Sequence, residues 1–385
     1  MHFAHSKRIA FAALSGLSLT FLYACGGSYD SSSGYGSSGP SYAYDSGSYN
    51  YGDYDSGRRD GASFGEDAGS ASTSDAAASA NDAAPPPPPP PPPTAHWQSL
   101  ASMPTSRDGL AAIFGTDGRL YAIGGYGEGG VTGVVEAYTP ATNSWTTVAP
   151  LPTPRHGLMA VLGHDGLIYA IGAYNDGFGA AQSAVVEVYS SATNTWSAGP
   201  SLVKGRYHAS AAVAANGRIY VMGGESGEKV YATVESYLPG DSAWVLESTV
   251  MTNARYGFGA GLGGDGQLHA FGGTNEFGDQ LATNESATPG SGWNTRTDLP
   301  FARMFFATTA FRGRIYALGG EQLLANAIEA PLRSVTIFDP ASNSWSPGED
   351  MPSVRFLHAA ATGPDGMIYV VGGVGTGRAL DAFTP

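Results

Sequence analysis

Short apolar runs joined by polar turns recur from about residue 94 to the end of the chain. In residues 151–173, LPTPRHGLMAVLGHDGLIYAIGA, two apolar runs flank Asp165-Gly166. Asp-Gly accepts the positive φ of a two-residue hairpin turn, so this stretch predicts two antiparallel strands. Arg155 and His156 precede the first strand. The stretch by itself leaves open whether they form a reactive site or belong to a structural repeat.

The same strand pair occurs six times, and each copy begins at an arginine. Each copy continues with an apolar run, a turn and a second apolar run that ends in Gly-Gly, or in Gly172-Ala173 in the second copy. A third run, such as VVEVY, and a tryptophan complete the unit. The arginines lie 48 to 52 residues apart, as do the tryptophans; they are Arg107, Arg155, Arg206, Arg255, Arg303 and Arg355, and Trp97, Trp145, Trp196, Trp244, Trp293 and Trp345.

A period near 50 residues with four short strands per unit predicts a β-propeller, because a four-stranded sheet cannot bury both of its faces alone. The arginine, the Asp-Gly turn, the Gly-Gly pair, VEVY and Asn-Thr-Trp resemble the kelch repeat over about residues 96–385. This resemblance implies an all-β, six-bladed kelch-type β-propeller. The last copy stops after a third strand at residues 380–385, so we expect the N-terminal strand in residues 94–100 to close the last blade.

The first 25 residues have the features of an export signal. Lys7 and Arg8 precede an apolar stretch over residues 9–24, which predicts a signal peptide that ends at residue 24. Cys25 is the only cysteine in the chain, and Leu-Tyr-Ala-Cys resembles the lipobox of bacterial lipoproteins. The resemblance implies that Cys25 is lipidated, and Gly26 after it implies an outer-membrane destination in the bacterial envelope.

Two low-complexity segments separate the cysteine from the predicted propeller. Residues 25–84 are rich in Gly, Ser, Tyr, Asp and Ala and lack aliphatic residues to bury, which predicts a lipid-anchored disordered tether. Nine prolines follow at residues 85–93 and predict a stiff polyproline spacer. The propeller domain is then expected over residues 94–385.

Composition and charge restrict the partners. The formal net charge is −14, which argues against nucleic acid as a partner and against adhesion to anionic lipid through protein charge. We therefore expect contact with a membrane through the Cys25 lipid only. Histidines such as His156 and His164 lack metal-binding spacing. The copper radical chemistry of some kelch-like oxidases needs a cysteine cross-linked to a tyrosine. The only cysteine here, Cys25, lies in the predicted lipobox, so that chemistry is not expected. We expect no metal, no cofactor and a monomer.

The candidate ligand-binding site is the rim at one end of the propeller. In the kelch family the innermost strand begins just after the arginine, near the mouth of the central channel, and the loops between second and third strands lie on the same face. Six guanidiniums there could bind carboxylate or sulfate groups; the favoured alternative for most of them is that each bonds carbonyls of the adjacent blade. The rim candidates are Arg107, Arg155, Arg206, Arg255, Arg303, Arg355, His156, Tyr207, His208, Tyr256, Glu225, Glu321, Tyr126 and Tyr174.

Three functions are compatible with these features. The preferred one is an envelope-anchored binding module for a protein, a peptide or a glycan, since acids beside exposed aromatic side chains suit such ligands. The second is a sugar isomerase similar to sialic-acid mutarotases, with Arg206, His208 and Glu225, or Arg355 and His358, as its groups. The third is a structural envelope scaffold. The recurring third-strand acids are expected to hydrogen-bond between blades; they are Glu136, Glu187, Glu235 and Glu285.

Overall fold

The computed structural model describes residues 96–174, 182–227, 229–324 and 328–385. The predicted signal peptide, Cys25, the tether and the proline spacer lie outside these described residues. Regular structure in the described part is β-strand apart from one 3-10 turn, η1 (Pro140–Thr142). None of the helices in the described part is long and apolar enough to cross a membrane.

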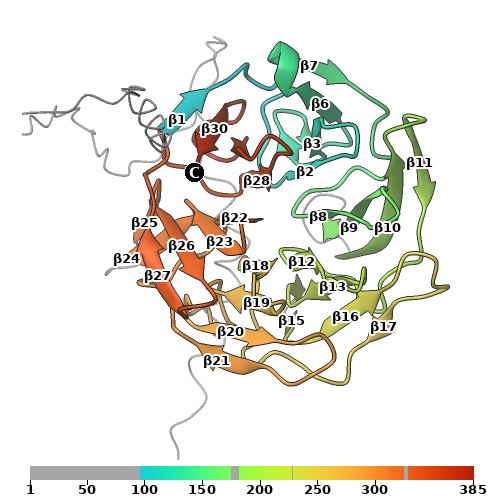
Figure 1. The fold of residues 1–385 in the computed structure, drawn as a ribbon. Coiled ribbons are helices and arrows are strands. Elements are labelled where there is room, and N and C mark those ends of the chain that lie inside the picture. The colour runs from blue at the N-terminus through green and yellow to red at the C-terminus, as the bar shows by residue number, and fades with distance from the viewer. Residues whose placement is uncertain (1–95, 175–181, 228, 325–327) are drawn as a thin grey trace, which may run out of the picture. The chain divides into compact units, whose positions relative to one another are not determined.

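The strands form six four-stranded antiparallel sheets arranged as a ring of blades (Figure 1). Blade one is β2 (Ala111–Phe114), β3 (Leu120–Ile123), β6 (Val135–Thr139) and β7 (Ser144–Thr147). Blade two is β8 (Met159–Leu162), β9 (Ile168–Tyr174), β10 (Gln182–Ser190) and β11 (Thr195–Ala198). Blade three is β12 (Ser210–Val213), β13 (Ile219–Met222), β16 (Val234–Tyr237) and β17 (Val245–Leu246).

The remaining blades repeat this order from the inner to the outer strand. Blade four is β18 (Gly259–Leu262), β19 (Leu268–Phe271), β20 (Asn284–Ala287) and β21 (Asn294–Arg296). Blade five is β22 (Ala307–Phe311), β23 (Arg314–Leu318), β26 (Val335–Asp339) and β27 (Ser344–Pro347). Blade six is β28 (Ala359–Thr362), β29 (Ile368–Val371), β30 (Leu380–Thr384) and β1 (His96–Ser99).

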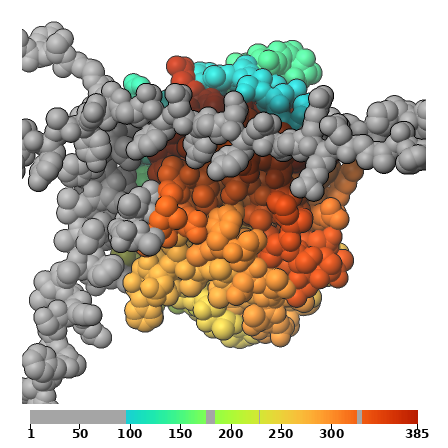
Figure 2. Space-filling model, turned by 90° about the vertical axis from the view of Figure 1, so that its left-hand side faces the viewer, coloured from blue at the N-terminus to red at the C-terminus, as the bar shows by residue number. Residues whose placement is uncertain are grey.

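Blade six is closed by the N-terminal strand, which confirms the prediction from the strand order. β1 pairs with β30 from His96↔Thr384 to Ser99↔Asp381, and the Trp97 ring stacks on Phe383 with centroids 4.9 Å apart. Figure 2 shows the cyan residues at the start of the described chain beside the red C-terminal residues. The ring therefore closes through pairing of the two ends of the propeller.

The turns between first and second strands take two forms, and the expected two-residue turn at Asp165-Gly166 is wrong. β8 ends at Leu162 and β9 begins at Ile168, while the Gly163 amide donates to Leu167 O at 2.9 Å and Gly166 has a φ of 79°. This is a longer loop with a left-handed glycine, a common hairpin alternative. Blade five instead has a two-residue turn, Arg312-Gly313, with φ of 49° and 79°.

The hydrophobic core is divided into six clusters, one between each pair of neighbouring blades. In the first cluster, Leu120 and Tyr138 of blade one pack with Tyr369 and Val371 of blade six. The other five clusters join blades one and two, two and three, three and four, four and five, and five and six. Each blade thus buries both faces against its neighbours, as a propeller requires.

Three small hairpins extend the loops between second and third strands. They are β4 (Tyr126–Gly127) with β5 (Gly130–Val131), β14 (Glu225–Ser226) with β15 (Lys229–Val230), and β24 (Glu321–Leu324) with β25 (Ile328–Pro331). They belong to blades one, three and five. All three lie at the end of the blades where the inner segments begin, so they help to shape one face of the propeller.

Candidate functional site

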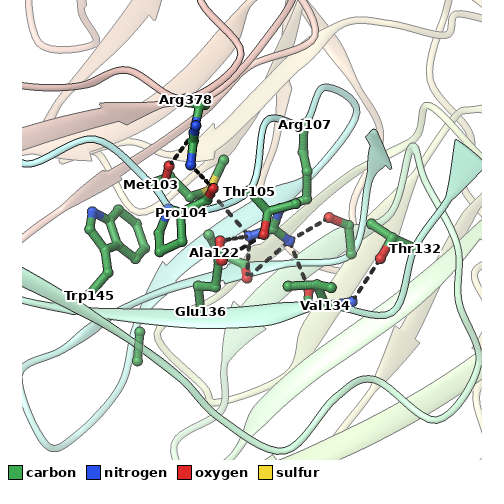
Figure 3. Close-up of polar contacts among 12 residues, drawn as sticks. Met103, Pro104, Thr105, Arg107, Ala122, Thr132, Val134, Glu136, Trp145 and Arg378 are labelled. Atoms are coloured by element: carbon green, nitrogen blue, oxygen red, sulfur yellow. Dashed lines mark hydrogen bonds and ion pairs between the residues drawn. The ribbon is translucent and has the colours of Figure 1, made fainter. Parts of the chain in front are cut away.

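The six repeat arginines are buried, with 0–1 % of their surface exposed. Arg107 shows the arrangement (Figure 3): Nη1 donates to Gly124 O at 2.8 Å and to Val134 O at 2.7 Å, and Nη2 donates to a Glu136 carboxylate oxygen at 2.8 Å. Four other blades repeat the ion pair, as Arg155–Glu187, Arg206–Glu235, Arg255–Glu285 and Arg355–Asp381. Each arginine thus joins the linker before a blade to that same blade.

The predicted cationic rim of six arginines is therefore wrong. The two predicted kinds of hydrogen bond between blades, from the arginines to carbonyls of the adjacent blade and from the third-strand acids, are wrong as well. The guanidiniums face inward because each has carbonyl and carboxylate acceptors on the second and third strands of its own blade, as Arg206 has in Gly223 O, Thr233 O and Glu235. The third-strand acids accept those bonds rather than bonds from a neighbouring sheet. Burial lowers the pKa of Arg206, and the Glu235 carboxylate opposes that shift.

The residue after each arginine lies where the inner segment of its blade begins, at the channel mouth. Each forms an isolated antiparallel bridge with the loop between second and third strands of its own blade. The bridges are Asp108↔Tyr126, His156↔Tyr174, Tyr207↔Glu225, Tyr256↔Thr274, Met304↔Glu321 and Phe356↔Val374. The bridges bring together seven of the predicted rim residues: Tyr126, His156, Tyr174, Tyr207, Glu225, Tyr256 and Glu321. His208, the remaining predicted residue that is not an arginine, contacts the Tyr207 ring and Glu225.

Directly after these bridge residues in each repeat, six backbone segments form a closed ring of hydrogen bonds. The residue two positions after each arginine donates its amide to the carbonyl of its counterpart in the preceding blade, at 2.7–3.2 Å. The six members are Gly109, Gly157, His208, Gly257, Phe305 and Leu357, and all have positive φ. The ring joins the inner ends of all six blades by hydrogen bonds. Sequence reasoning missed it, because glycine occupies only half of these positions.

An aromatic arc lines the mouth across blades one to five. The arc consists of Tyr126, His156, Tyr174, Tyr207, His208, Tyr256 and Phe305. Neighbouring ring centroids lie 4.9–6.4 Å apart, mostly edge to face, which is a favourable arrangement for aromatic pairs. Phe305 was not predicted, since nothing in its local sequence distinguishes it from a core residue.

Partial burial shifts the pKa values of two titratable groups at the mouth, Asp108 and His156. Burial raises the pKa of Asp108 to about 6. Burial, and then the neighbouring His208, lower the pKa of His156 to about 4. His208 Nδ1 lies 3.1 Å from Glu225 Oε1, which joins an imidazole and a carboxylate on the inner side of the arc. The mouth therefore combines aromatic faces with hydrogen-bonding groups.

A cavity of about 140 Å³ is lined by residues of all six blades, and all six members of the backbone ring are among them. Its polar lining includes His208, Ser210, Thr308 and His358. His358 is 6 % exposed, and burial, followed by the charge of Arg355, holds its pKa well below the usual range. No group of three or more potential metal-ligating side chains occurs among the described residues.

The groups assigned to a sugar isomerase do not assemble as that hypothesis required. His208 and Glu225 meet at the mouth, but the Arg206 guanidinium is buried and paired with Glu235, so it cannot reach a substrate carboxylate. Arg355 is likewise buried against Asp381. The predicted binding of an acidic sugar by these arginines is therefore wrong.

Comparisons with known proteins agree with this architecture. The kelch motif family matches residues 111–152, 155–203, 206–251 and 302–352. Mouse Kelch-like protein 35 is 26 % identical over 196 residues, which cover 51 % of this chain and 32 % of the relative. Kelch-like protein terF of Aspergillus terreus is 28 % identical over 218 residues, covering 53 % of this chain and 46 % of the relative. The chain thus spans less than half the length of either protein.

A solved structure has the same fold at low sequence identity. "Structure of YjhT" superposes with a TM-score of 0.62 at 14 % identity and covers 74 % of this chain and 95 % of that one. Blades four and six, which the family matches do not include, have the same strand order as the others. The chain therefore carries kelch repeats arranged as a six-bladed β-propeller.

Proposed function

We propose that this kelch propeller is a protein-interaction module that binds an extended peptide segment of its partner at the channel mouth. The observation that carries the proposal is the aromatic arc, which continues over five blades at one end of the channel. Tyr126 in the arc is 39 % exposed. Aromatic side chains supply much of the binding energy at protein interfaces because they bury a large area and lose little conformational freedom.

Apolar side chains on the neighbouring loops support a protein partner over a small ligand. Phe277 in the loop between β19 and β20 is 72 % exposed, and Leu323 and Leu324 in β24 are 42 % and 46 % exposed. The Leu323 amide donates to Gln280 Oε1 at 2.7 Å, which joins the loops of blades four and five. Exposed apolar groups beside polar ones are typical of a protein-binding surface.

The experiment is selection of binders to the full chain from a phage-displayed random peptide library. Tyr126→Ala and Tyr174→Ala should each weaken a selected peptide at least tenfold, because each removes a ring from the arc. Val245→Ala, an exposed side chain on the outer strand β17, is the matched control and should leave affinity unchanged. Equal binding by all four proteins would refute the proposal. If the chain instead binds a member of a glycan panel and Tyr126→Ala abolishes that binding, the mouth is a carbohydrate-binding site.

We further propose that the propeller is attached to the bacterial envelope through lipid on Cys25. The support is the charged start at Lys7 and Arg8, the apolar stretch over residues 9–24, and the position of the sole cysteine directly after it. In a bacterial host fed an alkyne fatty acid, the full chain should take up label and fractionate with the outer membrane. Cys25→Ser should abolish the label, and a labelled Cys25→Ser protein would overturn the assignment.

A further inference from the structure

Arg303 in blade five is the one repeat arginine without a carboxylate partner among the described residues. The third strand of blade five, β26, has Thr336 where four blades have glutamate and blade six has Asp381. Arg303 is nevertheless fully buried, with 0 % exposed. A buried guanidinium without a counter-charge is costly, so the fifth blade calls for a compensating group.

Blade four provides the template for what is missing. There Arg255 Nη2 donates both to Thr283 Oγ1 at 3.0 Å and to Glu285 Oε1 at 2.8 Å. In blade five Arg303 Nη2 donates to Ser334 Oγ at 3.3 Å, the counterpart of the threonine bond, but its second hydrogen has no acceptor among the described residues. Both guanidiniums donate through Nη1 to equivalent backbone carbonyls, and Arg303 lacks the carboxylate partner that Arg255 has.

Thr336 supplies a second buried donor at the strand position that glutamate holds in blade four, since the pair Ala317↔Thr336 corresponds to Ala270↔Glu285. Its side chain belongs to a residue only 6 % exposed, and Oγ1 has no hydrogen-bond partner within the described part of the chain. Threonine is shorter than glutamate, so its hydroxyl stops short of the place that the carboxylate reaches in blade four. A buried hydroxyl and a buried N–H without acceptors, at the strand and linker positions that a carboxylate joins in blade four, are complementary to an anion.

The Phe301 ring does not remove this need. Its centroid lies 4.3 Å from Arg303 Cζ, so the ring covers the flat face of the guanidinium, whereas a carboxylate meets the N–H edge. The ring also shields the cation from water, which strengthens its attraction for an anion. Burial lowers the pKa of Arg303 to about 10, which leaves it charged at neutral pH.

We propose that blade five binds a small monovalent anion, chloride or a carboxylate of the size of formate, between Arg303 Nη2 and Thr336 Oγ1. The anion takes the place that the Glu285 carboxylate has in blade four and completes the sixth buried ion pair of the ring. This site is buried within the blade and is independent of the proposed ligand site at the mouth.

The test is the melting temperature of the full chain at constant ionic strength. Sodium gluconate, whose anion is too large for the site, is replaced stepwise by sodium chloride in one series and by sodium formate in another. A saturable rise on the order of 5 °C is expected in at least one series, because only the folded state has the site. A rise in one series alone identifies which of the two anions the blade prefers.

Variants connect that rise to the site. Thr336→Glu supplies a covalent carboxylate and should melt higher in gluconate with no further response to either anion. Thr336→Val removes only the hydroxyl donor and should reduce the response several-fold. Thr147→Val, an exposed strand threonine in blade one, is the matched control and should respond like the unaltered chain. Crystals grown in bromide should show an anomalous peak beside Arg303.

Equal melting temperatures in all three salts, together with no bromide peak at Arg303, would overturn the proposal. So would a Thr336→Glu protein that responds like the unaltered chain. If Thr336→Glu does not fold, the response of Thr336→Val and the bromide peak still show whether an anion binds beside Arg303.

Discussion

The arginine at the start of each repeat shows how a residue's role depends on its partner. Five arginines face a carboxylate 26 to 32 positions later in their own repeat, and both side chains are buried. Removing one member of such a pair leaves an uncompensated charge and costs about 3–5 kcal/mol. The paired recurrence of arginine and acid is visible in the sequence, and it was the signal that could have identified internal pairing in advance.

At the channel mouth, Asp108 is expected to make stability depend on pH. Its carboxyl titrates near pH 3.8 when unfolded and near pH 6 in the folded protein. Below pH 3.8 it is protonated in both states. As pH rises from about 4 to 6, ionisation favours the unfolded chain, so the free energy of unfolding falls and stays lower above pH 6.

Asp108→Asn should remove this loss and increase the free energy of unfolding at pH 7.5 by roughly 2 kcal/mol, with little change at pH 4. Urea unfolding of the full chain at both pH values measures it. Glu128→Gln, an exposed change in the neighbouring loop, is the control and should leave the pH profile as it is. An Asp108→Asn profile parallel to that of the unaltered chain would show that the carboxyl is not the cause.

At the scale of elements, strand register and turn length follow from local rules only in part. The Asp-Gly pairs mark the hairpins, yet the turn at Asp165 is longer than two residues, because its carboxylate accepts bonds from the Leu167 amide and the Tyr169 hydroxyl. Arg312-Gly313 lacks such a carboxylate and forms the short turn. Arg303 and Gly319 are 16 positions apart, whereas Arg155 and Gly172 are 17 apart, so blade five has one residue fewer for its loop. The length of the loop therefore follows from this spacing together with the turn side chains.

β1 is the element on which closure of the ring depends. Deleting residues 94–101 removes all of β1 and exposes the edge of β30 and the Phe383 ring, so the cooperative unfolding transition should be lost or its midpoint should fall by more than 10 °C. Circular dichroism during heating of the full chain measures this. Deletion of residues 86–93, equal in length, is the control. An unchanged transition without β1 would mean that the ring does not need its closing strand.

At the scale of the whole molecule, the mouth exists only because the blades form a ring. Tyr126 and Phe305 are far apart in sequence, yet aromatic contacts connect them through the intervening blades. The closed circuit of six backbone hydrogen bonds beneath them holds the inner ends of the blades at fixed spacing. A ligand site at this position is therefore a property of the assembled ring, and no single repeat contains it.

The repeat, the six blades, the strand order and the closing strand can all be predicted from the sequence, because apolar runs, turn residues and a fixed period act within about fifty residues and recur six times. The tertiary structure alone decided which polar side chains face inward. Arg155 was expected at a rim and is buried against Glu187, while its neighbour His156 does reach the mouth. Sequence places these two residues side by side, and only the neighbouring blades and loops supply the acceptors and ring contacts that direct one inward and the other to the surface.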